Sequence, residues 1–372
     1  MKIFPVESPR DRSDFIHLPY KLYRNDPNWV APLRGELRKE FDPRTNPFLK
    51  HCEWQLFLLK EEGRIIGRIA AFIDTLAIDF WKERIGFFGY YECSADHVAS
   101  RLLLDAAAGW LRKKECTSMR GPWSFISQEW GMVLEGFTPA PVIMAPYNPP
   151  YYNEQLAAYG LGRIKDLLCW EISIADGYRI PGRIIELTDA VAERYGIRIR
   201  SLDMKRYDEE IQVIIELSNS TLIENWGYSP VTDEEVNTMA RDMKRIIQPK
   251  GVLFAEDRQG RAIGFAIVLP DLNHLLKGLN GRMLPFGFLR LLFGIPRLRR
   301  YRMFALGVIP EYQGKAVDSL LYRKLNEQLL SDDLWMEINY VLEDNWPMIN
   351  AINKLEARPS RRYRVYEMRL EP

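Results

Sequence analysis

One short pattern occurs twice in this chain of 372 residues, and the repetition restricts its fold more than any other feature. Leu-Phe at 56–57, followed by Gly-Arg-Ile-Ile-Gly at 63–67, returns 197 positions later (from 56 to 253) as Leu-Phe at 253–254 and Gly-Arg-Ala-Ile-Gly at 260–264. An apolar run, a turn and a second apolar run are typical of two adjacent strands. Self-similarity at a fixed offset predicts two copies of one structural unit.

A second echo shows where the two copies differ. Residues 159–172 match residues 355–368 at nearly the same offset. The leucine pairs at 102–103 and 320–321, each in a predicted helix, match at a larger offset. Each copy therefore carries its own insertion, at 121–150 in the first and at 271–300 in the second. Chance similarity of short strings is the alternative.

The chain is expected to have an α/β fold of the mixed-sheet α+β kind, with one unit over residues 1–178 and another over 179–372. Its length suits two domains, and 47% hydrophobic residues can build two cores. A net charge of +1 leaves no excess of cations for a nucleic-acid backbone, which argues against a general nucleic-acid binder. The four cysteines and four histidines lack metal-ligand spacing, so we expect reduced thiols and no metal. The N-terminus lacks the apolar core of a signal peptide, which favours a cytoplasmic protein.

The clearest functional signal lies in residues 303–325. An apolar run at 303–309 predicts a strand, Pro310 interrupts it, and leucines further on recur at helical spacing. The loop between them, at 313–316, contains small residues. A strand that ends in such a loop before a helix directs several backbone N–H groups at one point, where the positive end of the helix dipole favours a phosphate. An ordinary strand, loop and surface helix is the alternative.

The order of strand, Val-x-Pro-x-x-Gln-Gly-Lys-Ala loop and helix resembles the CoA pyrophosphate loop of the GNAT acyltransferase superfamily. The elements after the loop fit the resemblance: a predicted strand at 334–342, then Asn345, a helix over 346–355 and a closing strand at 361–370. The resemblance implies two tandem GNAT-like domains. It also implies transfer of an acyl group from acetyl-CoA, or a longer acyl-CoA, to an amine.

The same resemblance implies roles for individual residues. The candidates for binding the acyl-CoA are Leu306, Val308, Gln313, Gly314, Lys315, Ala316 and Asn345. Glu337 is the first candidate for the catalytic base and Glu224 the second. Tyr363 is a candidate acid, with Tyr340 and Tyr366 as alternatives. In the first copy, residues 92–97 occupy the place of the phosphate loop with two acids and no glycine, so we expect no usual CoA site there.

Several residues depart from the family pattern, among them Ala316 at a glycine position and Glu356-Ala357 in place of the usual Gly-Phe. Asp318 stands where glycine is common and brings a carboxylate near the expected phosphates, and Ile352 stands where many members carry a tyrosine. These departures leave a second hypothesis open, a non-catalytic module of the same fold that binds CoA, a lipid or a protein partner. The acyl chain length, the acceptor amine and the oligomeric state do not follow from the sequence.

Two aromatic segments are candidates for binding the acceptor. The loop at 222–230 lies between two predicted helices, where GNAT folds cover the acceptor pocket, and it contains Asn225, Trp226 and Tyr228. The insertion at 121–150 is dense in Gly, Pro and aromatic residues. Its candidates are Trp123 and Asn148, with Gln128, Glu129, Trp130 and Tyr151 as further lining. In both segments ordinary loop packing is the alternative.

The second insertion has an unusual charge pattern. From Leu272 through Pro310 the chain has no acidic residue, whereas seven Lys and Arg residues alternate with Leu, Phe and Met. Its apolar runs are too short and too interrupted by Gly and Pro to span a bilayer. A basic and apolar segment is typical of one that lies on an anionic membrane surface, which would make the protein membrane-peripheral. A hairpin packed on the protein, or a dimer contact, is the alternative.

Overall fold

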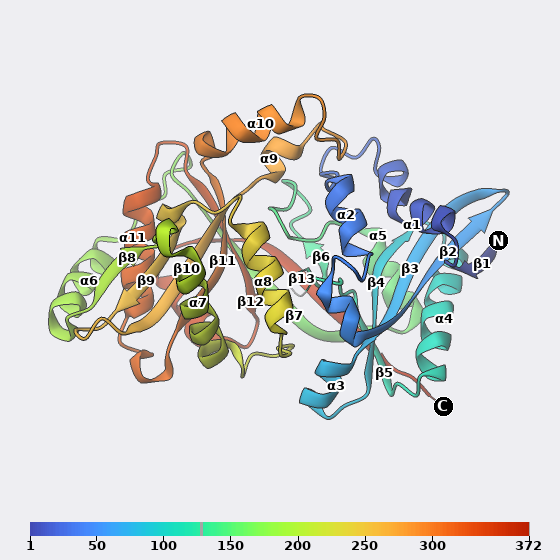
Figure 1. The fold of residues 1–372 in the computed structure, drawn as a ribbon, viewed down its shortest axis with the longest axis horizontal. Helices are drawn as coiled ribbons and strands as arrows, with labels where there is room; N and C mark the ends of the chain where they lie inside the picture. The colour runs from blue at the N-terminus through green and yellow to red at the C-terminus, as the bar shows by residue number, and fades with distance from the viewer. Residues whose placement is uncertain (127–128, 372) are drawn as a thin grey trace.

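The computed structural model describes residues 1–126 and 129–371, which form one mixed sheet flanked by helices (Figure 1). Five strands of the first half lie side by side in chain order: β1 (Lys2–Pro5), β2 (Cys52–Glu61), β3 (Arg64–Asp74), β4 (Ile85–Cys93) and β5 (Ser118–Gly121). Five strands of the second half follow the same order from the opposite edge: β8 (Arg198–Ser201), β9 (Val252–Glu256), β10 (Ala262–Pro270), β11 (Arg300–Val308) and β12 (Trp335–Leu342). In each half the last two of these strands are parallel. The matching orders agree with the two predicted copies.

The two halves exchange their final strands at the centre of the sheet. β7 (Gly162–Ser173) comes from the first half and pairs with β12, while β13 (Arg358–Arg369) comes from the second half and pairs with β5. β7 and β13 also pair with each other, and the short β6 (Met132–Glu135) pairs with β13. A single sheet therefore runs through both lobes of the molecule (Figure 1).

Helices cover both faces of this sheet. Those of the first half are α1 (Pro9–Leu22), α2 (Arg34–Glu40), α3 (Thr75–Trp81), α4 (His97–Lys113) and α5 (Tyr151–Tyr159). Those of the second half are α6 (Gly182–Tyr195), α7 (Tyr207–Leu222), α8 (Asp233–Met243), α9 (Asn273–Leu276), α10 (Gly287–Gly294), α11 (Val317–Leu329) and α12 (Trp346–Lys354). α4 and α11 connect the parallel strands of their halves, and each buries a leucine-rich face against the sheet.

Most predicted elements lie within a few residues of their observed bounds. The Thr-x-x-Glu pattern at 232–235 predicts a helix start, and Thr232 and Glu235 form a reciprocal capping box there, at the start of α8. For residues 173–200 the sequence predicts a linker and the first strand of the second copy; β8 begins at Arg198, but α6 occupies half of the segment. The buried residues of α6, Ile184, Thr188 and Val191, recur at helical spacing on one face. The four cysteines are free thiols, as predicted.

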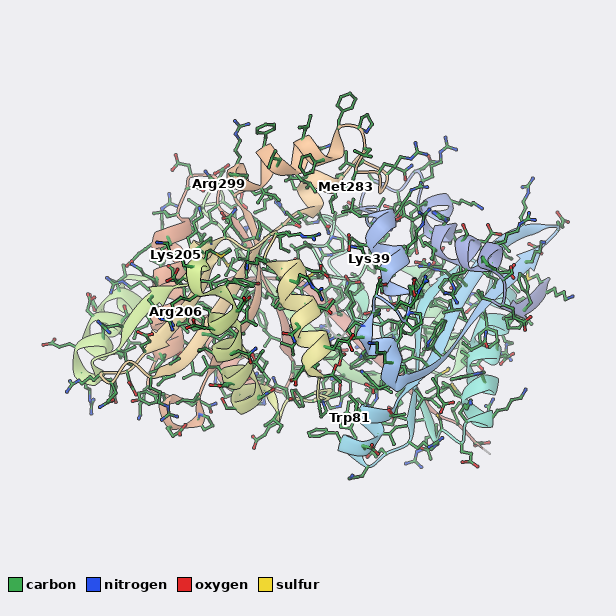
Figure 2. All side chains as sticks on the ribbon, viewed as in Figure 1. Lys39, Trp81, Lys205, Arg206, Met283 and Arg299 are labelled. Atoms are coloured by element: carbon green, nitrogen blue, oxygen red, sulfur yellow. The ribbon has the colours of Figure 1, made fainter. Side chains whose placement is uncertain are left out.

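The second insertion forms a helical hairpin that projects from the molecule between the labelled Arg299 and Met283 (Figure 2). A few of its leucines, at 272, 276 and 298, form a small core with neighbouring segments. Six large apolar side chains remain exposed: Leu284, Phe286, Phe288, Leu289, Leu292 and Phe293. Among the described helices, none has the length and hydrophobicity needed to cross a bilayer.

Candidate active site

The sheet opens between β11 and β12. Their parallel ladder ends at the pair Met303 and Ile338, after which β12 continues against β7 alone. Among the described strands, only β10 pairs with residues 304–308 of β11. The Ile309 N–H donates to Ile263 of β10, at 2.9 Å from N to O. Because successive residues of a strand present their N–H groups to opposite edges, those of Leu306 and Val308 face the gap.

The equivalent gap in the first half is filled by the chain itself. There the parallel ladder ends at Phe87 and Arg120, and the Trp123 N–H then donates to the Phe88 carbonyl at 2.8 Å. A Cβ atom added at Gly89 would lie only 1.7 Å from the Trp123 carbonyl oxygen. This close approach leaves no room for a ligand between β4 and β5.

The small-residue loop lies at the start of α11, next to the open gap. Gly314 and Ala316 have positive φ values of 74° and 58°, and the Gln313 side chain donates to the Val308 carbonyl at 3.1 Å. No side chain caps α11 at Ala316, so its first backbone N–H groups remain directed out of the helix. An ideal Cβ built on Gly314 meets nothing within 4 Å. The loop therefore offers an accessible cluster of N–H donors.

Asp318 changes the charge of this helix start. Burial raises the pKa of its carboxyl, although hydrogen bonds from the backbone N–H groups of Ser319 and Asp318 oppose the rise. The carboxylate thus uses donors that a phosphate would otherwise attract. The positive charge of Lys354 on α12 also opposes the rise in the pKa of Asp318.

Asn345 and Ile352 have structural roles in α12. The Asn345 side chain accepts from the Met348 N–H at 3.2 Å and caps the helix, and Ile352 is fully buried in the core of the second half. The tyrosine that the family pattern would place at 352 is therefore replaced by a packing residue.

A group of buried polar side chains, which we call the polar centre, lies beside the end of the β11–β12 ladder. It consists of Arg302, Glu337, Asn339 and Arg361, all at most 5% exposed. The Asn339 amide donates to Glu337 at 2.7 Å and accepts from Arg302 at 2.9 Å. Arg361 Nε lies 3.7 Å from the Glu337 carboxylate. Both arginines also donate to backbone carbonyls of the first insertion, at Pro139 and Ile143.

Ionisation within the polar centre is shifted by its burial. Desolvation raises the pKa of Glu337, and the positive charges of Arg361 and Arg302 reduce that rise. Burial also raises the pKa of Glu129 in the first insertion, and the positive charge of Arg302 reduces that rise. Burial also raises the pKa of Tyr340 and of Tyr363 well above the usual range, so both phenols keep their protons. Within the described part of the chain, the two hydroxyls are buried without a hydrogen-bond partner.

The loop at 222–232, which we call the acceptor loop, lies against the first half of the chain. The Trp226 ring lies 5.7 Å from that of Trp130, which stacks on Trp123 at 4.7 Å between centroids. Trp81 Nε1 donates to the Tyr228 carbonyl at 2.7 Å. The acceptor loop of one half is therefore held by aromatic residues of the other.

The remaining predicted residues lie in different surroundings. Asn225 lies in the acceptor loop, and Glu224 beside it is exposed. The Asn148 side chain is hydrogen-bonded to the backbone of Val133: its amide oxygen accepts from the Val133 N–H at 2.7 Å. The hydroxyls of Tyr151 and Tyr366 bond to Cys93 and Asn153 in the first half. Lys315 lies over the ring of Tyr312, and Gln128 is outside the described residues.

Sequence reasoning did not assign Arg302, Asn339 and Arg361 to a site. One signal was present: Glu337 and Asn339, like Arg361 and Tyr363, are polar residues two positions apart within predicted strands. Residues at this spacing share one face of a strand, and polar residues on a face flanked by apolar neighbours indicate a buried site.

This chain is similar to known proteins in both sequence and structure. No family model matches the chain. The "Bacterial ceramide synthase" of Caulobacter vibrioides is 32% identical over 382 aligned positions, covering 100% of this chain and 98% of that protein. "Protein YghO" of Escherichia coli is 33% identical, covering 97% of this chain and 93% of its own length. A tandem GNAT protein from the clavulanic acid biosynthesis pathway superposes with a TM-score of 0.56 at 15% identity, covering 100% of this chain and 99% of that one. The chain therefore has the tandem GNAT fold and belongs to the family of the Caulobacter ceramide synthase and YghO.

Proposed function

We propose that this protein transfers an acyl group from acyl-CoA to the nitrogen of a long-chain or lipid amine at a membrane surface. The observation that carries the proposal is the open gap between β11 and β12, which has N–H donors at Leu306 and Val308 and the polar centre beside it. The corresponding gap in the first half is closed, so one site per chain is expected, in the second half.

The loop before α11, the open edge of β11 and the polar centre each have a chemical task in this reaction. The backbone N–H groups of Gly314 and Ala316, at the start of α11, hold the CoA phosphates, while Gln313 fixes the loop on β11. The N–H groups of Leu306 and Val308 polarise the thioester carbonyl. The amine nitrogen attacks the carbonyl carbon, Glu337 accepts its proton, and the carbon–sulfur bond breaks. Tyr340 or Tyr363 donates a proton to the departing thiolate and is reprotonated with the proton that Glu337 took from the amine, so both groups return to their starting forms.

The chemistry of the hairpin supports a lipid acceptor. Its exposed apolar residues reach 79% exposure at Leu284 and 73% at Phe286, and the segment contains no acid to repel an anionic surface. Burying one methylene group contributes about 0.8 kcal/mol, so a long chain would bind far better than an acetyl group if it were sheltered here. The Caulobacter relative is named a ceramide synthase, and a ceramide is an N-acylated long-chain amine.

Release of free CoA thiol tests the catalytic part of the proposal. The purified protein would be incubated with acetyl-CoA or palmitoyl-CoA and with soluble or long-chain amines. We expect amine-dependent thiol release that is fastest with palmitoyl-CoA and a long-chain amine. Asp318 and Ile352 favour the rival hypothesis, a non-catalytic module, which predicts binding of acyl-CoA with no thiol release above the rate without protein.

Flotation with vesicles tests the membrane part separately. The wild-type chain is expected to float with vesicles that contain anionic lipid and to remain in solution with neutral ones. Replacing Phe286, Phe288, Leu292 and Phe293 by Ser is expected to abolish flotation. The matched control replaces Ile185 and Leu187, which are exposed on α6, by Ser and should float like the wild type. A wild-type protein that stays in solution with anionic vesicles would assign the hairpin to a protein contact instead.

A further inference from the structure

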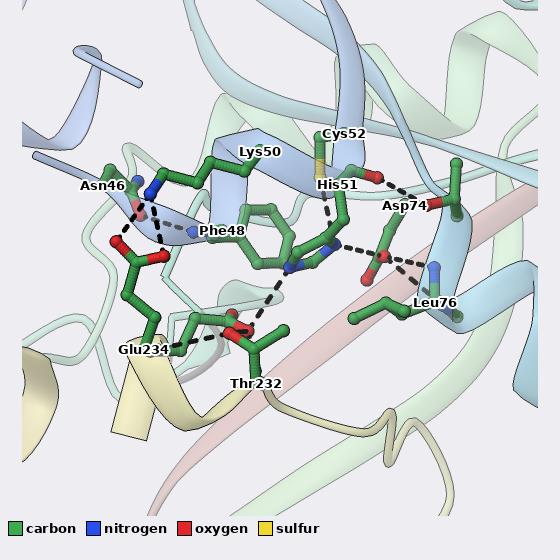
Figure 3. A network of polar contacts seen from close by, with 12 residues as sticks. Asn46, Phe48, Lys50, His51, Cys52, Asp74, Leu76, Thr232 and Glu234 are labelled. Carbon is green, nitrogen blue, oxygen red and sulfur yellow. Dashed lines mark hydrogen bonds and ion pairs between the residues drawn. The ribbon is translucent and has the colours of Figure 1, made fainter. Parts of the chain in front are cut away.

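His51 lies between two acids that come from different halves of the chain (Figure 3). Its Nδ1 atom is 2.9 Å from the Asp74 carboxylate, and its Nε2 atom is 3.3 Å from the Glu235 carboxylate. A neutral imidazole has one N–H donor, whereas an imidazolium has two. Only the charged form of His51 can therefore present an N–H to both acids; its contact with Asp74 is a hydrogen bond, whereas its contact with Glu235 is an ion pair outside hydrogen-bond geometry.

Each of these two acids organises the start of a helix. Asp74 is the N-cap of α3 and accepts from the Leu76 N–H at 3.0 Å. Glu235 closes the capping box of α8 and accepts from the Thr232 N–H at 2.7 Å. His51 thus joins the N-terminal ends of a first-half helix and a second-half helix.

The same two helices flank the acceptor loop. α8 begins directly after the loop, and α3 ends with Phe80 and Trp81, whose side chains contact Tyr228. The Tyr228 ring lies 5.6 Å from that of Phe80, in addition to the bond from Trp81 to the Tyr228 carbonyl. A shift of α3 relative to α8 would therefore move the acceptor loop.

We propose that His51, as an imidazolium, is a positioning residue that holds the acceptor loop of the second half against the first half. The first half, whose own gap is closed, then contributes to acceptor binding by anchoring that loop. This inference rests on the proposed function only for the identity of the ligand; the link between the halves stands on the geometry alone.

The groups around His51 indicate how the link responds to pH. Besides Asp74 and Glu235, the imidazole faces the Cys52 thiol, with Sγ 4.0 Å from Nδ1, and the Phe48 ring. Lys50 and Glu234 form an exposed pair nearby, at 2.6 Å. Burial lowers the pKa of His51, but the interactions of the imidazole with the carboxylates of Asp74 and Glu235 outweigh burial and raise the pKa to about 9.

The sign of the pH dependence follows from this shift. An unfolded histidine has a pKa of about 6.5, so the folded value is the higher one. The link is therefore at full strength below about pH 6.5 and is lost as the pH rises through about 9. The side-chain N, S and O atoms of His51, Cys52 and Asp74 lie within 4.8 Å of one another, as in some metal sites. Here, however, the Asp74 carboxylate already forms hydrogen bonds with His51 and with the N-terminal end of α3.

Tryptophan fluorescence tests the link without any substrate. Trp226 stacks near Trp130 and Trp123, so movement of the acceptor loop changes its emission. The wild type, treated with EDTA, is expected to show a transition centred near pH 9 that His51→Gln lacks. Glu235→Gln should also lack it, whereas the double variant Lys50→Ala, Glu234→Gln should keep it.

Kinetics provide the second readout. At pH 7 we expect His51→Gln to raise KM for the amine about tenfold, within the usual range for coupled sites, and to leave binding of the acyl-CoA unchanged. A transition near pH 9 that persists in folded His51→Gln, or that disappears in the Lys50–Glu234 control, would overturn the proposal. If no amine is acylated, the fluorescence titration still decides whether His51 joins the halves.

Discussion

Replacing Gly314 by Asp is expected to abolish binding of acyl-CoA. Gly314 has a φ of 74°, in the left-handed region that side chains adopt at a cost, and an added Cβ would meet nothing within 4 Å, so the new side chain would occupy open space at the loop. The new carboxylate would lie near the CoA phosphates, where repulsion between unit charges about 4 Å apart reaches about 4 kcal/mol. We therefore expect affinity to fall by at least about 100-fold, measured by calorimetry with CoA.

The matched control is Gly260→Asp. Gly260 has nearly the same backbone conformation, with a φ of 80°, and an added Cβ would likewise meet nothing within 4 Å. It lies in the turn before β10, away from the loop, so this variant should show the same backbone strain and bind CoA normally. Equal affinity in the two variants would place the phosphates elsewhere, and a stoichiometry of two would assign a second site to the first half.

Replacing Glu337 by Gln is expected to lower kcat by a factor of about 10²–10⁴, the usual contribution of a general base. Gln keeps an oxygen for the bond from Asn339 but cannot accept the proton of the amine. Because burial raises the pKa of Glu337, the wild-type rate should increase with pH as this carboxyl loses its proton, and the variant should lack that increase. The measurement is kcat between pH 5 and 9.

Stability must be followed alongside activity, since Arg361 would lose a buried partner. Breaking a buried ion pair costs about 3–5 kcal/mol, so thermal unfolding of Glu337→Gln should be recorded first. Glu171→Gln is the control, because Glu171 is opposite Glu337 on β7 but is partly exposed and paired with Arg358. Loss of the pH-dependent increase in Glu224→Gln, with Glu337→Gln unaffected, would make Glu224 the base.

The two copies, their strands and the loop at 313–316 could all be predicted from the sequence, because their signals are local. Apolar alternation, turn residues and helix caps act within about ten residues, so GRIIG and its echo identify the same hairpin in both halves. The capping box of Thr232 and Glu235 is likewise a local signal, because its two residues lie within one helical turn. The basic, acid-free composition of the second insertion is also a property of the sequence itself.

Only the tertiary structure decided which residues from distant segments meet. β7 and β13 are both long strands with polar and apolar residues on each face. No pattern within either strand predicts that it pairs with the other half of the chain. That exchange brings Arg361 of β13 to Glu337 of β12 and places both beside the first insertion. His51 likewise meets Glu235 across 184 positions of chain (from 51 to 235), so its role follows from packing. Hydrogen bonds and charges act over a few ångströms in space, and sequence patterns report that proximity only within a single helix, strand or turn.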